Sequence, residues 1–189
     1  MAATAHKQPI NCDILIIGAG VMGLATGIAL LKAKPGLKVI IAEKEKQLAM
    51  HASGRNSGVL HAGFYYSPDS LKAKFCRDGN KELRKLAIKY EIPIREVGKV
   101  VVTRNEDENQ RLETLYQRGI ANGVDIEMLD ASKLPEFEPL AFTHERFLWS
   151  PSTAVSDSKS IVEAMRKDFE AKGGKIYFNS KSISRQNNT

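Results

Sequence analysis

The chain has 189 residues, of which 42% are hydrophobic and 26% charged, and its formal net charge is +6. This composition is ordinary for a globular protein, and the length suits one domain or parts of two. No apolar run approaches the roughly 18 residues that a membrane-spanning helix needs. No nucleic-acid recognition motif accompanies the positive charge, so the sequence gives no support for nucleic-acid binding.

Residues 1–12 are short and polar, and they are expected to form a flexible tail. They contain neither the apolar core of a signal peptide nor an Arg-rich amphipathic helix, so the expected location is cytoplasmic. The two cysteines, Cys12 and Cys76, fit a reducing compartment. Neither has a metal-ligand companion nearby, so no metal site is expected. Cys76 is expected to pack on a helix face.

A strand–helix–strand pattern follows the tail. The short β-branched run at 14–17 predicts a buried strand, a helix is expected to extend to about Lys34, and a second strand is expected over 37–42. Residues 18–23, between the first strand and the helix, read GAGVMG, which is a G-x-G-x-x-G motif.

Each glycine of this motif has a physical task in dinucleotide binding. Gly18 allows a tight turn, Gly20 lets the backbone approach a pyrophosphate, and Gly23 lets helix and strand pack closely. The phosphates would lie at the helix N-terminus, where N–H groups and the helix dipole favour anions. Glu43 stands 20 residues after Gly23, where a carboxylate accepts hydrogen bonds from a ribose. An ordinary glycine-rich turn does not explain this register, so the pattern predicts a dinucleotide site.

Residues 50–66 form a loop rich in glycine and small residues, with two histidines, an arginine and an aromatic cluster. A purely structural loop does not need this composition directly after the ribose-binding strand. Ser53 or Ser57 could cap a helix and present backbone N–H groups to a phosphate. The glycines would let the backbone lie against a flat ring, so the loop is expected to face the cofactor.

Residues 71–90 are expected to form a basic amphipathic helix, with Leu71 and Phe75 among its regularly spaced apolar residues. Its seven basic residues are Lys72, Lys74, Arg77, Lys81, Arg84, Lys85 and Lys89. A solvated face is the simpler interpretation of this charge. The alternative is attraction to an anionic substrate or to an acidic membrane surface, which would add peripheral contact at the inner face of a membrane.

The rest of the chain alternates strands and helices. The predicted elements are a strand over 97–103, a helix over 106–121, strands over 125–129 and 146–149, a helix over 159–172 and a strand over 175–178. Asn105 is the expected N-cap of the first of these helices. The order predicts a cofactor domain formed by 13–93 and 149–189, interrupted by part of a substrate cap at 94–148.

Three stretches, 16–24, 53–66 and 70–76, resemble the flavin-dependent oxidoreductases of the D-amino-acid oxidase superfamily, and most closely the L-2-hydroxyglutarate dehydrogenase/oxidase family. The likeness covers most of residues 13–180. It implies an α/β fold, with an FAD-binding Rossmann-like domain of the glutathione-reductase type and part of an inserted α+β substrate cap.

The resemblance also implies FAD as the cofactor. The residues expected to bind it are Gly18, Gly20, Val21, Met22, Gly23, Glu43, Lys44, Ser53, Gly54, Arg55, Asn56 and Ser57. The implied reaction is hydride transfer from the C2–H of a small 2-hydroxy acid, such as L-2-hydroxyglutarate, to the flavin. A base must then take the hydroxyl proton.

His61 is the candidate base, because a histidine with a near-neutral pKa suits that role. Its alternative role is a hydrogen bond to the flavin or to the backbone. His51, at the start of the loop, is expected to be structural. Tyr65 and Tyr66 could orient a carboxylate, but a packed aromatic pair is the preferred interpretation.

The chain departs from the family pattern at its end. It stops at Thr189, before the further strands and the late glycine-containing segment that the family fold requires, so a truncated N-terminal fragment is expected. Such a fragment is expected to be inactive alone or to need a partner chain for the C-terminal half. The alternatives are an amine or amino-acid oxidase, an NAD-dependent dehydrogenase, which the loop at 53–63 disfavours, and a non-catalytic remnant. Oxygen, a quinone and a carrier protein all stay open as electron acceptors.

Overall fold

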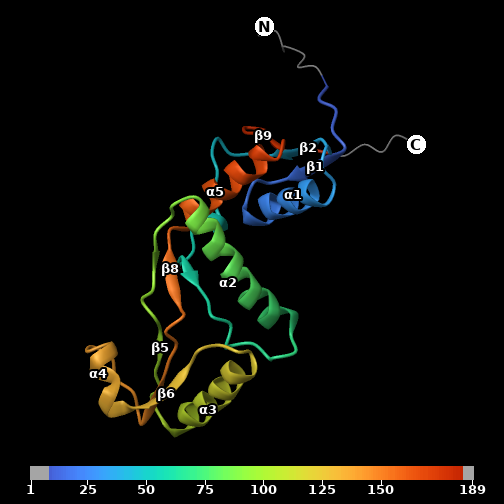
Figure 1. The fold of residues 1–189 in the computed structure, drawn as a ribbon. Helices are drawn as coiled ribbons and strands as arrows, with labels where there is room; N and C mark the ends of the chain where they lie inside the picture. Colours follow the sequence, from blue (N-terminus) through green and yellow to red (C-terminus); the bar gives the residue numbers. More distant parts are fainter. Residues whose placement is uncertain (1–8, 185–189) are drawn as a thin grey trace. The chain divides into compact units, whose positions relative to one another are not determined.

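The computed structural model describes residues 9–184, which divide into two compact units (Figure 1). The first unit contains the residues up to Asn56 and those from Ser158 onward, and the second contains Ser57–Asp157. Most of the predicted tail at 1–12 lies outside the described residues.

The unit boundaries differ from the predicted domain boundaries at residues 93 and 148. Strand β3 (Val59–Leu60) and helix α2 (Leu71–Lys89) belong to the second unit, although the sequence assigns both to the cofactor domain. Strand β3 belongs to the second unit because it pairs in antiparallel fashion with β8 (Ala154–Ser156) of that unit. The compact units therefore do not coincide with the predicted segments.

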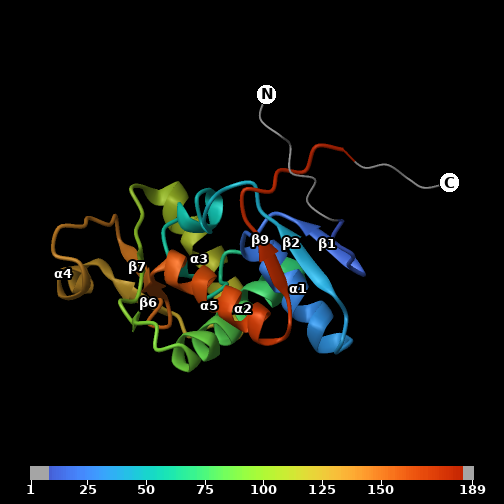
Figure 2. The same ribbon diagram turned by 90° about the horizontal axis from the view of Figure 1, so that it is seen from above.

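The first unit is a parallel sheet with two packed helices. Its elements are β1 (Ile14–Ile17), α1 (Val21–Ala33), β2 (Val39–Ala42), the 3-10 helix η1 (Ala52–Gly54), α5 (Ser158–Ala171) and β9 (Lys175–Tyr177). The strand order is β1-β2-β9 with both pairs parallel, and Figure 2 shows β2 between its neighbours. The predicted strand–helix–strand pattern is confirmed.

Helices α1 and α5 pack closely because one of them carries a glycine at the contact. A Cβ on Gly27 of α1 would lie 2.6 Å from Cε2 of Phe169 on α5. Phe169 is completely buried, as are Leu24 of α1 and Ile41 of β2. Val162 of α5 is also buried, like Phe169 in the same helix. This core fixes α1, and therefore the turn that precedes it, against the sheet.

The second unit consists of two small antiparallel sheets and helices. Besides β3, α2 and β8, its elements are β4 (Ile94–Arg95), β5 (Val100–Val101), α3 (Glu106–Ala121), β6 (Glu127–Asp130), the 3-10 helix η2 (Ala131–Lys133), α4 (Leu134–Phe137) and β7 (Arg146–Trp149). The strand orders are β3-β8-β4 and β5-β7-β6. Its core consists of Ala62, Phe64, Leu112, Val124, Ile126 and Leu148. The Asn105 side chain accepts the Glu108 N–H, so the predicted N-cap of α3 is confirmed.

Helix α2 is present as predicted, but its apolar face is different. Leu71 and Phe75 are 67% and 64% exposed, whereas the buried residues of the helix are Ala73 and Ala87. Small side chains allow the backbone of α2 to lie close to its neighbours, so Leu71 and Phe75 are left outside, whereas Leu83 and Leu86 are partly buried. The strand predicted over 97–103 is also wrong in extent, because β5 contains only two residues. Across the described residues, no helix has the length and apolarity that a membrane span requires.

Candidate functional site

The glycine-rich turn joins β1 to α1 in the first unit. Gly18 has φ +97°, a value that L side chains rarely adopt, and its N–H donates to the Ala42 carbonyl oxygen (2.8 Å). A Cβ on Gly23 would lie 2.0 Å from the Gly18 carbonyl oxygen. A Cβ on Gly20 would lie 3.0 Å from Ser53 Oγ. Glycine is therefore required at 18 for the turn and at 23 for the contact between helix and turn.

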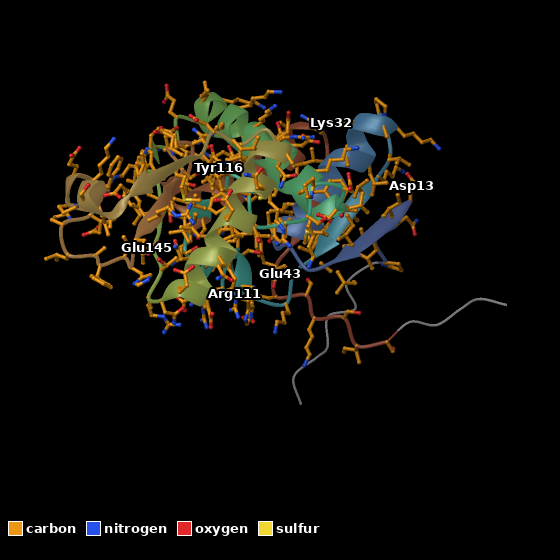
Figure 3. The ribbon with its side chains drawn as sticks, turned by 90° about the horizontal axis from the view of Figure 1, so that it is seen from below. Asp13, Lys32, Glu43, Arg111, Tyr116 and Glu145 are labelled. Atoms are coloured by element: carbon orange, nitrogen blue, oxygen red, sulfur yellow. The ribbon has the colours of Figure 1, made fainter. Side chains whose placement is uncertain are left out.

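Glu43 lies directly after β2 (labelled in Figure 3), and its carboxylate reaches the turn. One oxygen accepts the Ala19 N–H (2.7 Å) and the other accepts the Glu45 N–H (2.9 Å). These charge-assisted hydrogen bonds fix the carboxylate in position. A carboxylate offers about four lone-pair sites, so it can still accept hydroxyl donors. The acid predicted to bind the ribose thus lies beside the glycine turn.

Ser53 caps α1 from a distant part of the chain. Its Oγ accepts the Val21 N–H (3.0 Å), whereas the N-cap residue Gly20 has no side chain to do so. The sequence predicts that Ser53 or Ser57 caps a helix, and the structure shows that Ser53 caps α1, whereas its own loop forms only the single 3-10 turn η1. The other N–H groups of the first turn of α1, together with the Ser53 O–H, are the donors that the site offers to an anion.

These residues meet at an open pocket of the first unit, with a volume of about 80 Å³. Its lining residues are Ala19, Gly20, Glu43, Glu45, Gln47, Ala49, Met50, His51 and Ser53. His51 Nε2 lies 2.8 Å from Glu45 Oε1, and this hydrogen bond lowers the pKa of the Glu45 carboxyl. The contact agrees with the structural role predicted for His51. Sequence reasoning missed Gln47 and Ala49, whose only signal is that they closely follow Glu43.

The 3-10 turn η1 is held by two of the predicted cofactor residues. The Asn56 side-chain amide donates to the carbonyl oxygens of Ala52 and Ser53 (3.1 and 3.0 Å). A Cβ on Gly54 would lie 2.1 Å from the Ala49 carbonyl oxygen, so glycine is needed there for a close backbone approach. Asn56 and Gly54 therefore position Ser53 in this structure.

The remaining predicted cofactor residues are not part of this pocket. Met22 is 76% exposed and Arg55 is also exposed. Lys44 lies at the surface, where its Nζ is 3.5 Å from Glu45 Oε1. Ser57 belongs to the second unit.

His61 also belongs to the second unit, where it directly follows β3. Its carbonyl oxygen accepts from Asn80 Nδ2 (3.0 Å) and from Cys76 Sγ (3.6 Å), both on α2. Partial burial and, to a lesser extent, the nearby Lys99 lower the pKa of the imidazole. The ring is therefore neutral at physiological pH and able to accept a proton. Sequence reasoning missed Asn80 and Lys99.

Cys76 and Tyr65 both pack within the second unit. Burial raises the pKa of the Cys76 thiol, which keeps it protonated and agrees with the predicted packing role. The predicted pair of Tyr65 and Tyr66 is wrong, because Tyr65 stacks on Phe64 with 4.3 Å between ring centroids. Phe64 is the core residue of this segment, whereas Tyr66 is 39% exposed.

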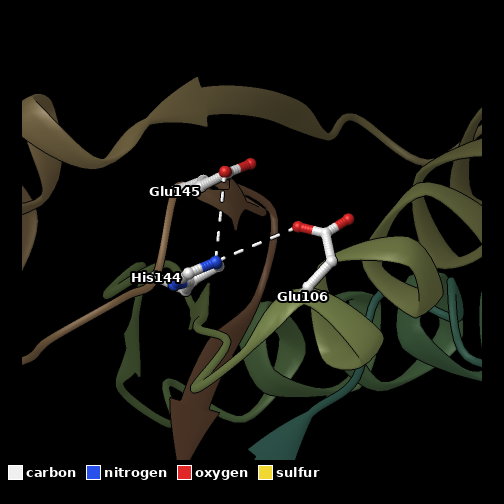
Figure 4. Close-up of side chains that lie close together, drawn as sticks. All are labelled: Glu106, His144 and Glu145. Atoms are coloured by element: carbon white, nitrogen blue, oxygen red, sulfur yellow. Dashed lines mark ion pairs between the residues drawn. The ribbon is translucent and has the colours of Figure 1, made fainter.

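A separate group of titratable side chains lies on the surface of the second unit (Figure 4). His144 Nε2 is 3.9 Å from a carboxylate oxygen of Glu106 and of Glu145. All three residues are exposed. Exposed ion pairs of this kind stabilise a protein by about 1 kcal/mol at most. The group is explained as surface ion pairing beside α3, and we assign no metal to it.

Comparison with known proteins places the chain among flavin enzymes. The family model described as FAD dependent oxidoreductase (DAO) matches residues 13–189. The chain is 46% identical to the mitochondrial L-2-hydroxyglutarate dehydrogenase of Caenorhabditis elegans over 166 residues, covering 87% of this chain and 38% of the relative. It is 40% identical to that of Dictyostelium discoideum (96% and 43%) and 37% identical to the L-2-hydroxyglutarate dehydrogenase of Escherichia coli strain K12 (89% and 40%). The chain thus spans about two fifths of the length of these relatives.

Solved structures share the fold. An L-α-glycerophosphate oxidase from Mycoplasma pneumoniae with FAD bound is 30% identical, with a TM-score of 0.75, and the match covers 89% of this chain and 44% of that one. For the L-proline dehydrogenase of P. horikoshii the identity is 17%, the TM-score 0.79 and the coverage 91% and 45%, which shows the fold alone. The predicted α/β FAD-binding fold is confirmed.

Proposed function

Because the chain belongs to the family of FAD dependent oxidoreductases, we propose that it binds FAD and contributes to the oxidation of L-2-hydroxyglutarate to 2-oxoglutarate. The observation that supports this substrate is the 46% identity, over 87% of the chain, to a relative named L-2-hydroxyglutarate dehydrogenase. Since the chain spans about two fifths of such relatives, its proposed share is the FAD site and part of the substrate pocket.

The residues of the first unit fit the diphosphate and ribose of FAD. No side chain stands at Gly20, so a pyrophosphate could approach the N–H groups at the start of α1 and the Ser53 hydroxyl. The Glu43 carboxylate would accept hydrogen bonds from the ribose hydroxyls. Gly20, Glu43 and Ser53 line one pocket, so these contacts are compatible with a single ligand.

FAD, when bound, supplies the acceptor for the hydride that leaves C2 of the substrate. The group proposed to take the substrate's hydroxyl proton is the His61 imidazole. Its lowered pKa keeps it in the basic form at neutral pH. The Asn80 amide, which donates to the His61 carbonyl oxygen, holds the backbone of the base against α2.

The FAD site is tested by adding FAD to the purified chain, removing the excess and recording the visible absorbance. The wild type should keep its flavin bands, and Glu43→Gln should lose most of them. The matched control is Glu127→Gln, a change at an exposed glutamate of the second unit, which should keep them. A colourless wild-type chain would contradict the proposal for this chain and favour a non-catalytic remnant.

The substrate is tested by anaerobic bleaching of the bound flavin. L-2-hydroxyglutarate should bleach it, and glycine or D-amino acids should not. His61→Asn should keep FAD but slow the bleaching by about 10²-fold or more, because it removes the base. Bleaching by glycine instead would favour an amino-acid oxidase, the class represented by the Bacillus cereus glycine oxidase structure, which is 25% identical to this chain.

For location, we propose peripheral membrane contact through the first turns of α2. Leu71 and Phe75 are exposed there, beside the exposed Lys72 and Lys74, an arrangement that suits an anionic lipid surface. The cytoplasmic location stays a prediction, and some relatives are named mitochondrial. The chain should sediment with phosphatidylserine vesicles at low salt and be released at high salt. No binding at low salt would remove this part of the proposal.

A further inference from the structure

A second pocket lies in the second unit, on the basic side of helix α2. Its volume is about 330 Å³, and small-molecule sites in proteins measure roughly 300–1,000 Å³. The charged and polar side chains that line it include Arg77, Asn80, Lys81, Arg84, Glu96 and Asp125. All of its lining residues belong to the second unit, so it is separate from the pocket at the glycine turn. We call it the α2 pocket.

The three cations of the α2 pocket come from one face of the helix. Arg77, Lys81 and Arg84 are four and three positions apart, and residues with this spacing are neighbours on a helix surface. The lining also contains Ala62 and Val124, which are both buried and apolar. This part of the basic helix therefore faces a lined pocket and is not simply a solvated surface.

Arg84 and Asn80 form a fixed wall of the pocket. The Arg84 guanidinium donates to the Asn80 side-chain oxygen (2.7 Å) and to the Ser152 carbonyl oxygen (2.8 Å). It also donates to both carboxylate oxygens of Glu96, so these two charges neutralise each other. The Asn80 amide nitrogen donates to the His61 carbonyl oxygen (3.0 Å). These groups hold one another in place and are already occupied.

Arg77, Lys81 and Asp125 keep their capacity to bind a ligand. Among residues 9–184, the Lys81 ammonium and the Asp125 carboxylate have no ion-pair or hydrogen-bond partner. Arg77 pairs with the adjacent Asp78 through Nε (3.3 Å), which leaves its two terminal nitrogens as donors. All three side chains are exposed, so a ligand can reach them. The pocket thus offers two cationic donors and one anionic acceptor.

We propose that the α2 pocket binds a small hydroxylated oxyanion, with its phosphate or carboxylate oxygens on Arg77 and Lys81 and a hydroxyl group donating to Asp125. Hydrogen bonds to charged partners are the stronger ones, and this ligand makes them with both signs of charge. A bare anion is repelled by the Asp125 carboxylate, and an uncharged sugar does not use the cations. The inference does not depend on FAD, on the proposed substrate or on the membrane contact.

The test measures binding to the purified chain by isothermal titration calorimetry at low salt. Ribose 5-phosphate and citrate represent the phosphate and the carboxylate form of the ligand, and their relative affinities identify the anion. Sulfate supplies the charge without hydroxyl groups, and ribose supplies hydroxyl groups without charge. At least one of the first two probes should bind about tenfold more tightly than sulfate and ribose.

Variants then assign the binding to the α2 pocket. Lys81→Met should weaken it at least about tenfold, because a charged donor is lost. Lys85→Met is the matched control, since it removes the same charge from the same helix outside the pocket, and it should bind as the wild type does. Asp125→Asn should reduce the preference over sulfate, because the repulsion of a bare anion is removed. All three positions are exposed, so the variants should keep the wild-type melting temperature.

A second measurement locates the ligand without any substitution. The NMR signals of the Asn80 side-chain amide should shift as the probe is added, because Asn80 lines the α2 pocket. The glycine turn is the competing anion site, and Ser53→Ala removes a hydroxyl donor there. The probe should bind to Ser53→Ala as tightly as to the wild type.

Four results would overturn the proposal. They are no binding of ribose 5-phosphate and citrate, sulfate binding as tightly as both, equal weakening by Lys81→Met and Lys85→Met, and unchanged Asn80 signals when binding is lost in Ser53→Ala. Because no FAD or substrate is present in these experiments, failure of the proposed function would leave their results unchanged.

Discussion

The glycine turn of the first unit and the His61 region of the second unit are built in opposite ways. At the turn, the backbone itself makes the site, and glycine is required by φ +97° at Gly18 and by the 2.0 Å approach at Gly23. Around His61, the environment is made by side chains far away in the sequence, such as Asn80 and Lys99. Adding one methyl group should therefore disrupt the glycine turn. Single substitutions around His61 should each change the stability of the second unit only slightly.

The largest effect is expected for Gly23→Ala. Its Cβ would lie 2.0 Å from the Gly18 carbonyl oxygen, so the turn must open. We expect the free energy of unfolding to fall by at least about 2 kcal/mol and flavin retention to be lost. Gly79→Ala is the control, because nothing lies within 4 Å of its Cβ inside α2, and it should stabilise by about 0.5–1 kcal/mol. Denaturant titration measures the free energy of unfolding, and visible absorbance measures flavin retention. A Gly23→Ala variant as stable as the wild type would refute the requirement for glycine at this contact.

Gly20→Ala should separate binding from folding. Gly20 has φ −74° and ψ 177°, which alanine adopts easily, and the nearest atom to a Cβ would be the movable hydroxyl of Ser53 at 3.0 Å. The free energy of unfolding should change by less than about 1 kcal/mol. FAD affinity should fall at least about tenfold, because the methyl group would stand where the pyrophosphate approaches. Undiminished affinity in a flavin titration would show that the phosphates do not lie over Gly20.

The same contrast explains what the sequence could predict. Local patterns determine the turn, since the strand period, the glycine spacing and the position of Glu43 are all readable within 31 residues, 13–43. The partner of Ser53 was not readable, because Val21 lies 32 positions earlier and only tertiary packing brings the two together. The unit boundaries were missed for a similar reason. They depend on the pairing of β3 with β8, and strands of two and three residues are too short to leave a periodic pattern.

Ser53→Ala tests whether the distant cap belongs to the cofactor site. Removing its hydrogen bond to the Val21 N–H should cost about 1 kcal/mol of stability. Ser70→Ala is a matched control, because Ser70 Oγ accepts the Ala73 N–H at the start of α2 and its loss should cost a similar amount. Only Ser53→Ala should also weaken FAD binding, by a few fold, since it removes a donor to the phosphates. Equal FAD affinity in the two variants would limit Ser53 to a structural role.

The smallest effect is expected at His61, where the observable is the pH dependence of stability. Partial burial, and to a lesser extent Lys99, lower the pKa of His61 below its ordinary value of 6.5 in the folded state. Between these two pKa values the unfolded chain binds more protons, so stability rises with pH. The contribution is complete above pH 6.5 and is lost as the pH falls through the folded pKa.

His61→Gln should therefore lose less stability on acidification than the wild type in urea titrations. Lys99→Met should reduce the effect only slightly, because burial is the larger cause. If the wild type and His61→Gln lost equal stability, the imidazole would be as well solvated as in the unfolded chain, and the region would offer no environment that favours a neutral base.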